Sequence, residues 1–524
     1  MATTIPTQLD KCKGAMVATA IGDALGWPNE QRAKNTKKKV VASDSFVEWS
    51  RRCKKPCWHT EKILPGEYSD DTQLTLSVAR SIIAGNWEEQ FSRKELPFWL
   101  TYERGGGRAL LQAAKCYKEG YYPWQSKYSS EYYNAGGNGA VMRILPHIIA
   151  STEIADLNEL MSLVIKNCIL THGHPRAILG TTCYAFALNY LLKKETILEY
   201  GELVDALIDA QLVWGAFPNS ISIFHWLNYA ESNAPYAYRD IWEQSVAHMV
   251  EQLLHIKASL KKGLILDDQK VLTQLECFGS VNGAGDVAIL AAVYLASKYA
   301  NNPQLGIRVP ACSSGADTDT IASITGGLLG MLCGTSWIPD HWKKVQDYEC
   351  IVRMTELLLS SSKKEDSKAL VSEVRNTSDQ WENSPIGWIK KVNVLEYEAS
   401  KERLISISRY QSALGQTFYS KDYQVIPQNE QMQMPLYSGN LSKNTFSEPP
   451  FNGTGVTTGK QKEFILTASE IDILLKNPSL KNKTFGKILS ALHSLALGKD
   501  TCDSLAKKLR IDREIIDLLS KHFK

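Results

Sequence analysis

Two short loops, each with a pair of aspartates, place the strongest constraint on how this chain folds. One is Ser69-Asp70-Asp71-Thr72, and the other is Asp317-Thr318-Asp319-Thr320. Each loop comes directly before an apolar run with helical spacing, Gln73 to Ala84 in one case and Ile321 to Leu332 in the other. Aspartates favour helix starts, because they accept hydrogen bonds from free N–H groups and complement the positive end of the helix dipole. Capping explains one such loop more readily than two.

The four carboxylates also make a set of oxygen ligands for a hard cation. Mg²⁺ and Mn²⁺ take carboxylate, hydroxyl and water oxygens. Clustered carboxylates are costly without a cation, because like charges resist joint ionisation. We therefore expect the two loops, with Asp71 and Asp317 separated by 317 − 71 = 246 positions, to fold against each other around shared cations. The alternative is that both loops only cap their helices.

The rest of the chain up to about residue 360 is predicted to be helical. Almost every periodic segment has helical spacing, and the strands that a parallel α/β sheet needs are missing. The sequence therefore predicts an all-α domain over residues 9–362. Its first helix should end at Gly26-Trp27-Pro28, because glycine and proline stop helices, and this leaves Glu30 in a loop. Residues 31–65, with a basic run from Lys34 to Lys39, are expected to be an exposed insertion.

The composition changes after residue 362. Residues 363–425 contain alternating and β-branched residues and are predicted to form a small mixed α/β extension, with a hairpin around Leu414-Gly415-Gln416. Residues 426–461 are rich in Gln, Asn, Ser, Gly and Pro, which predicts a flexible linker. Helical spacing returns in residues 462–524. Residues 501–521 resemble a helix-turn-helix, but the acidic residues of the second helix favour a small bundle that docks on a partner over contact with nucleic acid.

Charge and cysteine content exclude few functions. The chain has 59 Lys and Arg against 56 Asp and Glu, a net charge of +3, so nothing global argues for nucleic acid or a membrane surface. Eleven scattered cysteines, no signal peptide and no stretch of 18 apolar residues predict a cytoplasmic protein. Cys53, Cys57 and His59 resemble part of a zinc site, but no second Cys/His pair at ligand spacing accompanies them.

Two glycine-rich loops are candidate ligand sites. Gly105-Gly106-Gly107 comes before a helical run, and Gly136-Gly137-Asn138-Gly139 comes before another. Loops without side chains let a ligand lie close to the backbone, and a helix start can present N–H groups to phosphate. A plain flexible turn is the alternative for the first loop. Thr171-His172-Gly173-His174 opens a further apolar helix, and its two histidines cannot share one helical face.

Taken in order, these motifs resemble the ADP-ribosylglycohydrolase family, which includes the dinitrogenase-reductase-activating glycohydrolases and the ADP-ribosyl-acceptor hydrolases. The resemblance covers about residues 9–360. The matching motifs are Gly22-Asp23-Ala24-Leu25-Gly26, Ser69-Asp70-Asp71-Thr72-Gln73, Gly137-Asn138-Gly139-Ala140, Thr171-His172, Gly315-Ala316-Asp317-Thr318-Asp319-Thr320 and Trp337-Ile338-Pro339.

The resemblance implies an all-α fold with two Mg²⁺ or Mn²⁺ ions at the bottom of a cleft. By motif position, it implies these metal ligands: Ser69, Asp70, Asp71, Asp317, Asp319 and Thr320. It matches Glu30 to an acidic residue that gates or assists catalysis in relatives, and Asp70 or Asp71 could double as the base. It places these residues along the ADP-ribose channel: Gly105, Gly106, Gly107, Asn138, Gly139 and His172.

The function implied is a metal-dependent hydrolase that removes ADP-ribose from protein side chains, arginine-linked by preference, and so reverses an ADP-ribosyltransferase. Its partners would be ADP-ribosylated proteins and a cognate transferase. Two alternatives stay open: an antidote protein that occludes a transferase or its target, and a hydrolase of another linkage, to serine, nucleic acid or O-acetyl-ADP-ribose. Ser69 stands where relatives usually have threonine, which keeps the hydroxyl, and Ala316 replaces a glycine.

Overall fold

A computed structural model describes residues 5–33, 43–53, 58–263, 266–362, 381–400, 403–425 and residue 503. The chain divides into two units, Met1–Pro435 and Leu436–Lys524. All helices and strands discussed below belong to the first unit. The predicted linker (426–461) and the predicted C-terminal helical module (462–524) lie outside the described residues, apart from Asp503.

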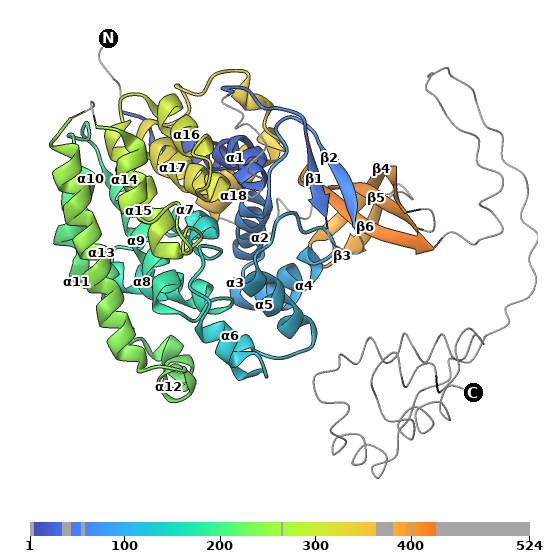
Figure 1. Ribbon diagram of the computed structural model, residues 1–524, viewed down its shortest axis with the longest axis horizontal. Helices are drawn as coiled ribbons and strands as arrows, with labels where there is room; N and C mark the ends of the chain where they lie inside the picture. The colour runs from blue at the N-terminus through green and yellow to red at the C-terminus, as the bar shows by residue number, and fades with distance from the viewer. Residues whose placement is uncertain are drawn as a thin grey trace, which may run out of the picture. The chain divides into compact units, whose positions relative to one another are not determined.

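The first unit is mainly helical, as predicted, and Figure 1 shows the helices gathered in one body. The α-helices between residues 8 and 362 are α1 (Gln8–Ala33), α2 (Asp70–Ile83), α3 (Trp87–Glu89), α4 (Leu96–Trp99), α5 (Arg108–Lys118), α6 (Ser129–Tyr133), α7 (Leu145–Ala150), α8 (Leu157–Ile169), α9 (Pro175–Lys193), α10 (Glu202–Asp209), α11 (Gln211–Trp214), α12 (Phe224–Asn233), α13 (Tyr238–Leu260), α14 (Asp268–Gln274), α15 (Gly285–Lys298), α16 (Pro303–Ala311), α17 (Thr318–Cys333) and α18 (Tyr348–Ser362). The all-α prediction for this region is confirmed, apart from one two-stranded hairpin.

Helices α1 and α17 are almost wholly buried and pack backbone against backbone. A Cβ on Gly22 would overlap the carbonyl group of Ala322, and one on Gly326 would overlap that of Ala18. The close contacts recur every four residues and run in opposite directions along the helices: Gly14 with Gly330, Ala18 with Gly326, Gly22 with Ala322, and Gly26 with Thr318. This antiparallel packing brings the end of α1 beside the first turn of α17, which carries the second aspartate loop.

Helix α1 does not end where the sequence predicts. It continues through Pro28 to Ala33, so Glu30 lies on the helix and not in a loop. Proline removes one intrahelical hydrogen bond, which usually breaks a helix. Here tertiary contacts outweigh this cost, because Thr318 Oγ1 donates to the carbonyl oxygen of Gly26 (2.8 Å) and Asn29 Nδ2 donates to that of Ala311 (2.7 Å).

A hairpin of strands β1 (Trp49–Cys53) and β2 (His59–Ile63) follows α1. Its inward-facing side chains are buried, and the rings of Trp49 and Trp27 meet edge to face with centroids 5.1 Å apart. The expectation of an exposed insertion is therefore wrong for this part of residues 31–65. The basic run Lys34 to Lys39 lies outside the described residues.

A second sheet follows the helical body. Strands β3 (Trp381–Ser384), β4 (Gly387–Ser400), β5 (Arg403–Ser412) and β6 (Thr417–Val425) are antiparallel and lie side by side in that order. The turn between β5 and β6 is the hairpin predicted around Leu414 to Gln416, with Gly415 at a φ of +97°. Phe418 and Ile389 are buried in one apolar cluster with Leu74 of α2. The sheet therefore packs onto the helices, next to the β1–β2 hairpin (Figure 1).

Among the helices that the structure describes, none combines the length and the apolar character needed to cross a membrane.

The packing of α1 on α17 predicts a strong effect of a single methyl group. Gly22→Ala should lower the free energy of unfolding by about 1–3 kcal/mol, because an added Cβ forces two backbones apart. Gly279→Ala is the matched control, since its Cβ would meet only the carbonyl oxygen of Glu276 at 3.6 Å. Denaturant unfolding of both variants measures the difference. Equal stabilities would contradict close backbone packing.

Candidate functional site

The two predicted aspartate loops meet, although 249 positions separate the residues that touch. Thr320 Oγ1, on the first turn of α17, donates a hydrogen bond to Asp71 Oδ2, on the first turn of α2, at 3.3 Å. Ser69 Oγ donates to the same oxygen at 3.4 Å. Ser69 is the N-cap of α2 and accepts a hydrogen bond from the N–H of Asp71. The cap of α2 is therefore the serine, and the carboxylates of Asp70 and Asp71 remain available to the site.

A cavity of about 430 Å³ opens between the loops. Its walls include most of the predicted site residues: Glu30, Asp70, Asp71, Gly105, Gly106, Gly107, Asn138, Gly139, His172, Asp317, Asp319 and Thr320. Ser69 is fully buried behind this wall. A neighbouring cavity of about 710 Å³ shares Arg108, Ala109 and Gly137 with the first. The structure thus gathers residues from α1, α2, α5, α17 and two glycine loops around one space.

Asp23 holds the first loop from behind. Its Oδ1 accepts a hydrogen bond from the N–H of Ser69 (2.9 Å), and its Oδ2 accepts from the N–H (3.0 Å) and Oγ1 (2.6 Å) of Thr72. Asp23 is completely buried on α1. Asp23 is not among the site residues predicted from the sequence, although it stands in the motif Gly22 to Gly26. The signal in the sequence is an acidic residue within a helix of mostly small and apolar residues, where a charged side chain is unusual.

The carboxyl groups around the cavity repel one another. Burial and then the charge of Asp23 hold the pKa of Asp70 well above its usual range. Burial, followed by neighbouring carboxylates, also raises the pKa values of Asp71 and Asp319, and for Asp319 the charge with the largest effect is that of Glu30. Like charges packed this closely need protons or a cation to neutralise them.

One atom of this group fits a cation ligand directly. Asp71 Oδ1 is buried and has no hydrogen-bond partner in the described part of the chain. An unpaired buried acceptor is expensive, so such atoms call for a specific explanation. A set of aspartate oxygens with the hydroxyls of Ser69 and Thr320 suits Mg²⁺ or Mn²⁺, which prefer hard oxygen ligands. The residues present therefore fit a divalent metal site.

The glycines of the first loop allow its close approach to the carboxylates. Gly105 has a φ of +119°, and a Cβ there would lie 2.5 Å from Asp70 Oδ1. The N–H groups of Gly105 and Gly106 donate to Glu103 Oε2 at 3.2 and 3.3 Å. These two N–H groups thus already bind an anionic oxygen, which is the chemistry expected of a site for phosphate.

Asn138 and His172 also line the cavity. Asn138 Nδ2 donates to Asp317 Oδ2 at 2.8 Å, and the N–H of Asn138 donates to the carbonyl oxygen of Gly283 at 3.0 Å. His172 Nδ1 lies 2.8 Å from Thr171 Oγ1. Burial and then the positive charge of Arg143 lower the pKa of His172 to about 3, so its imidazole is neutral at physiological pH.

The candidate zinc site at Cys53 and His59 lies beside basic side chains. Cys53, His59 and Glu61 have their ligand atoms within 4.8 Å of one another. However, Glu61 is paired with Arg104 (2.7 Å) and with Lys421 (2.7 Å), so basic side chains already supply the positive charge. Burial raises the pKa of the Cys53 thiol, which disfavours the thiolate that zinc binds. Cys57 lies outside the described residues.

Comparison with known proteins identifies the family. The sequence model of the ADP-ribosylglycohydrolases matches residues 4–368. The chain belongs to the ADP-ribosylglycohydrolase family. It is 24% identical over 370 residues to the ADP-ribosylarginine hydrolase Tri1 of Serratia proteamaculans. The aligned region covers 68% of this chain and 81% of the relative.

Two further relatives belong to the same group. The chain is 24% identical to the ADP-ribosylhydrolase ARH3 of Danio rerio, over 64% of this chain and 86% of the relative. It is 28% identical to the ADP-ribosyl-[dinitrogen reductase] glycohydrolase of Rhodospirillum rubrum, over 32% of this chain and 54% of the relative. The predicted class of enzyme, a hydrolase of glycosidic linkages to ADP-ribose, is thereby confirmed.

The geometry of this ADP-ribosylglycohydrolase predicts stabilisation by metal. Adding Mn²⁺ to metal-free protein should raise the melting temperature, because a ligand at about 100 times its Kd adds about 2.7 kcal/mol of stability. Asp71→Asn should lose most of this shift, since it removes the charge beside the unpaired Oδ1. Asp156→Asn, a change at the exposed N-cap of α8, should keep the shift. A Mn²⁺ shift in Asp71→Asn as large as that of the wild-type protein would contradict the site.

Proposed function

We propose that this chain is a metal-dependent hydrolase that removes ADP-ribose from modified protein side chains, arginine-linked by preference. The observation that carries the proposal is the contact between Thr320 and Asp71, which places two acidic helix starts in one cavity. The similarity to an ADP-ribosylarginine hydrolase over 81% of that relative supports the choice of linkage. Such an enzyme would reverse a cognate ADP-ribosyltransferase, and its substrates would be ADP-ribosylated proteins.

The cofactor we propose is a pair of Mg²⁺ or Mn²⁺ ions. These residues would hold them: Ser69, Asp70, Asp71, Asp317, Asp319 and Thr320. When bound, two such ions would supply positive charge for the sugar hydroxyls and lower the pKa of water. The serine and threonine hydroxyls, which now donate to Asp71, would keep that carboxylate aimed between the two helix starts.

The protein's own groups would divide the remaining tasks. A glycosidic bond at the anomeric carbon of ribose breaks through an oxocarbenium-like state, so catalysis needs nearby negative charge and a base for water. Glu30 is half-buried at the cavity wall, and we assign it the role of accepting the proton. Asp70 or Asp71 is the alternative base. The neutral His172 would contribute a hydrogen bond without charge.

The substrate would run from this cavity along the glycine loops. The first glycine loop, Gly105 to Gly107, lies directly before helix α5. Its backbone N–H groups would suit a diphosphate when the diphosphate replaces the Glu103 carboxylate as their acceptor. Asn138 and Gly139 would form the other side of the channel. The adjoining cavity, whose lining includes Tyr128 and Tyr132, offers aromatic surface for a nucleobase.

Release of ADP-ribose tests this proposal. Incubation of the full chain with Mg²⁺ and an arginine-ADP-ribosylated protein should release ADP-ribose. Asp317→Ala should lower kcat/KM by about 100-fold or more, the scale for removing one essential electrostatic group. Asp156→Asn should keep full activity. A wild-type protein that is inactive on arginine, serine and O-acetyl linkages, or full activity of Asp317→Ala, would overturn the proposal.

The antidote alternative predicts a different result. A protein that only occludes a transferase would still neutralise it after Asp70 and Asp319 are both changed to Asn. A hydrolase would lose neutralisation together with turnover. Measuring both properties of this double variant in one assay separates the two functions.

A further inference from the structure

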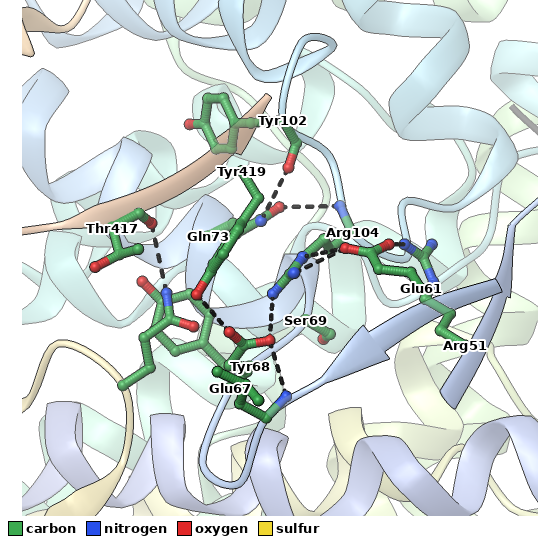
Figure 2. Close-up of polar contacts among 12 residues, drawn as sticks. Arg51, Glu61, Glu67, Tyr68, Ser69, Gln73, Tyr102, Arg104, Thr417 and Tyr419 are labelled. Carbon is green, nitrogen blue, oxygen red and sulfur yellow. Dashed lines mark hydrogen bonds and ion pairs between the residues drawn. The ribbon is translucent and has the colours of Figure 1, made fainter. Parts of the chain in front are cut away.

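The four-stranded sheet contacts segments that lead into the candidate metal site, through residues that do not line the cavity. Tyr419 of strand β6 contacts Glu67, in the turn before Ser69, and Arg104, in the segment before Gly105 (Figure 2). Both of these segments lead directly into groups that line the cavity. We propose that the sheet positions the metal ligands of the site and that Tyr419 is its central positioning residue. This inference rests on the proposed function, which makes the cavity an active site, but its test does not need turnover.

Tyr419 connects the two segments through one side chain. Its hydroxyl donates a hydrogen bond to Glu67 Oε1, and its ring lies under the guanidinium of Arg104, 3.8 Å from the ring centroid. Glu67 and Arg104 are also paired with each other, Nη1 to Oε2, at 2.8 Å. All three side chains are at least 94% buried, because their exposed fractions are 6%, 6% and 2%. Charged groups at such depth need complete pairing, and removing one partner is costly.

From Glu67 the constraint passes to the first aspartate loop. Glu67 Oε2 also accepts from the N–H of Leu64 at 3.2 Å, which closes the turn around Gly66. Gly66 has a φ of +85°, and its carbonyl oxygen accepts from the N–H of Gln346 at 2.9 Å. Only Tyr68 separates this turn from Ser69, the cap of α2. The position of Asp70 and Asp71 therefore depends on how the Glu67 carboxylate is held.

A second contact from β6 holds Tyr68 itself. The N–H of Thr417 donates to Asp347 Oδ2 at 2.9 Å, and the hydroxyl of Tyr68 donates to the same oxygen at 2.6 Å. Nearby, Gln416 Oε1 accepts a hydrogen bond from Arg80, a buried residue of α2. The strand thus holds the turn before α2 through Glu67 and, by way of Asp347, through Tyr68. The turn between β5 and β6 holds the helix through Gln416.

From Arg104 the constraint passes to the glycine loop. The N–H of Arg104 donates to Gln73 Oε1 at 3.2 Å, so the start of the loop is tied to α2. Its guanidinium is held by Glu61, and Lys421 of β6 donates to the other oxygen of Glu61 at 2.7 Å. The next residue, Gly105, lies against Asp70. One buried network therefore sets the spacing between Asp70 and the loop that faces it.

Neither Tyr419 nor Lys421 lines the cavity, so neither touches substrate. Their effect must act through orientation of the ligands. Outer-shell partners of metal ligands typically change metal affinity by about 10–100-fold when they are removed. A purely structural role of the sheet would lower stability and leave the affinity of the folded protein unchanged.

Tyr419→Phe in the full chain is the decisive variant. It keeps the ring under Arg104 and removes only the hydroxyl that donates a hydrogen bond to Glu67. Tyr410→Phe makes the same change on β5, where the ring lies under the exposed Lys391. Calorimetric titration with Mn²⁺ should show a roughly 10-fold weaker Kd for Tyr419→Phe, and an unchanged Kd for Tyr410→Phe. In turnover, kcat should fall more than KM changes.

Lys421→Met and Lys421→Arg repeat the test without the tyrosine. Methionine removes the charge beside Glu61 and should weaken Mn²⁺ binding, and arginine should restore it. These variants decide the matter if Tyr419→Phe does not fold. Wild-type Mn²⁺ affinity in folded Tyr419→Phe and Lys421→Met would overturn the inference. If the wild-type protein binds Mn²⁺ but hydrolyses no ADP-ribose linkage, the proposed function fails, and the affinities still decide the role of the sheet.

Discussion

Backbone contact between α1 and α17 is the constraint on which the rest of the structure depends. Helices with side chains at the contact lie 8–10 Å apart, and small residues let them come closer. Here glycines on both helices remove the side chains where the backbones meet. As a result Glu30 of α1 lines one cavity with Asp317 and Asp319, and Asp23 of the same helix holds the loop that carries Asp70 and Asp71. The carboxylates of one site thus come from opposite ends of the sequence of the helical domain.

This arrangement concentrates negative charge where a folded protein usually avoids it. Asp23, Asp70, Asp71 and Asp319 are all buried, and burial raises the pKa of each. The surrounding framework tolerates the repulsion because separate partners hold the loops. Asp23 holds Ser69 and Thr72. Glu67 lies in the turn before Ser69 and is paired with Arg104, which comes directly before Gly105. Stability and function would be coupled here, since a cation that relieved the repulsion would also be the proposed cofactor.

Much of the site could be predicted from the sequence because its signals are local. Paired aspartates before apolar helices, and glycines before α5, are visible without a structure. Other features depend on contacts between distant segments. Pro28 continues α1 because Thr318 and Ala311 hold its neighbours, and Asp23 accepts a hydrogen bond from Ser69, 46 positions away. The contacts of Tyr419 are of the same kind, because Glu67 lies 352 positions before it. No local pattern distinguishes such a tyrosine from one in an ordinary strand.

The central claim is that the two aspartate loops hold a pair of cations between them. Anomalous diffraction from crystals grown with Mn²⁺ tests it most directly. The account predicts two peaks, about 3.5–4 Å apart as in other two-metal sites, in contact with Asp70, Asp71, Asp317 and Asp319. The absence of peaks between α2 and α17, or a peak only beside Cys53, His59 and Glu61, would contradict it.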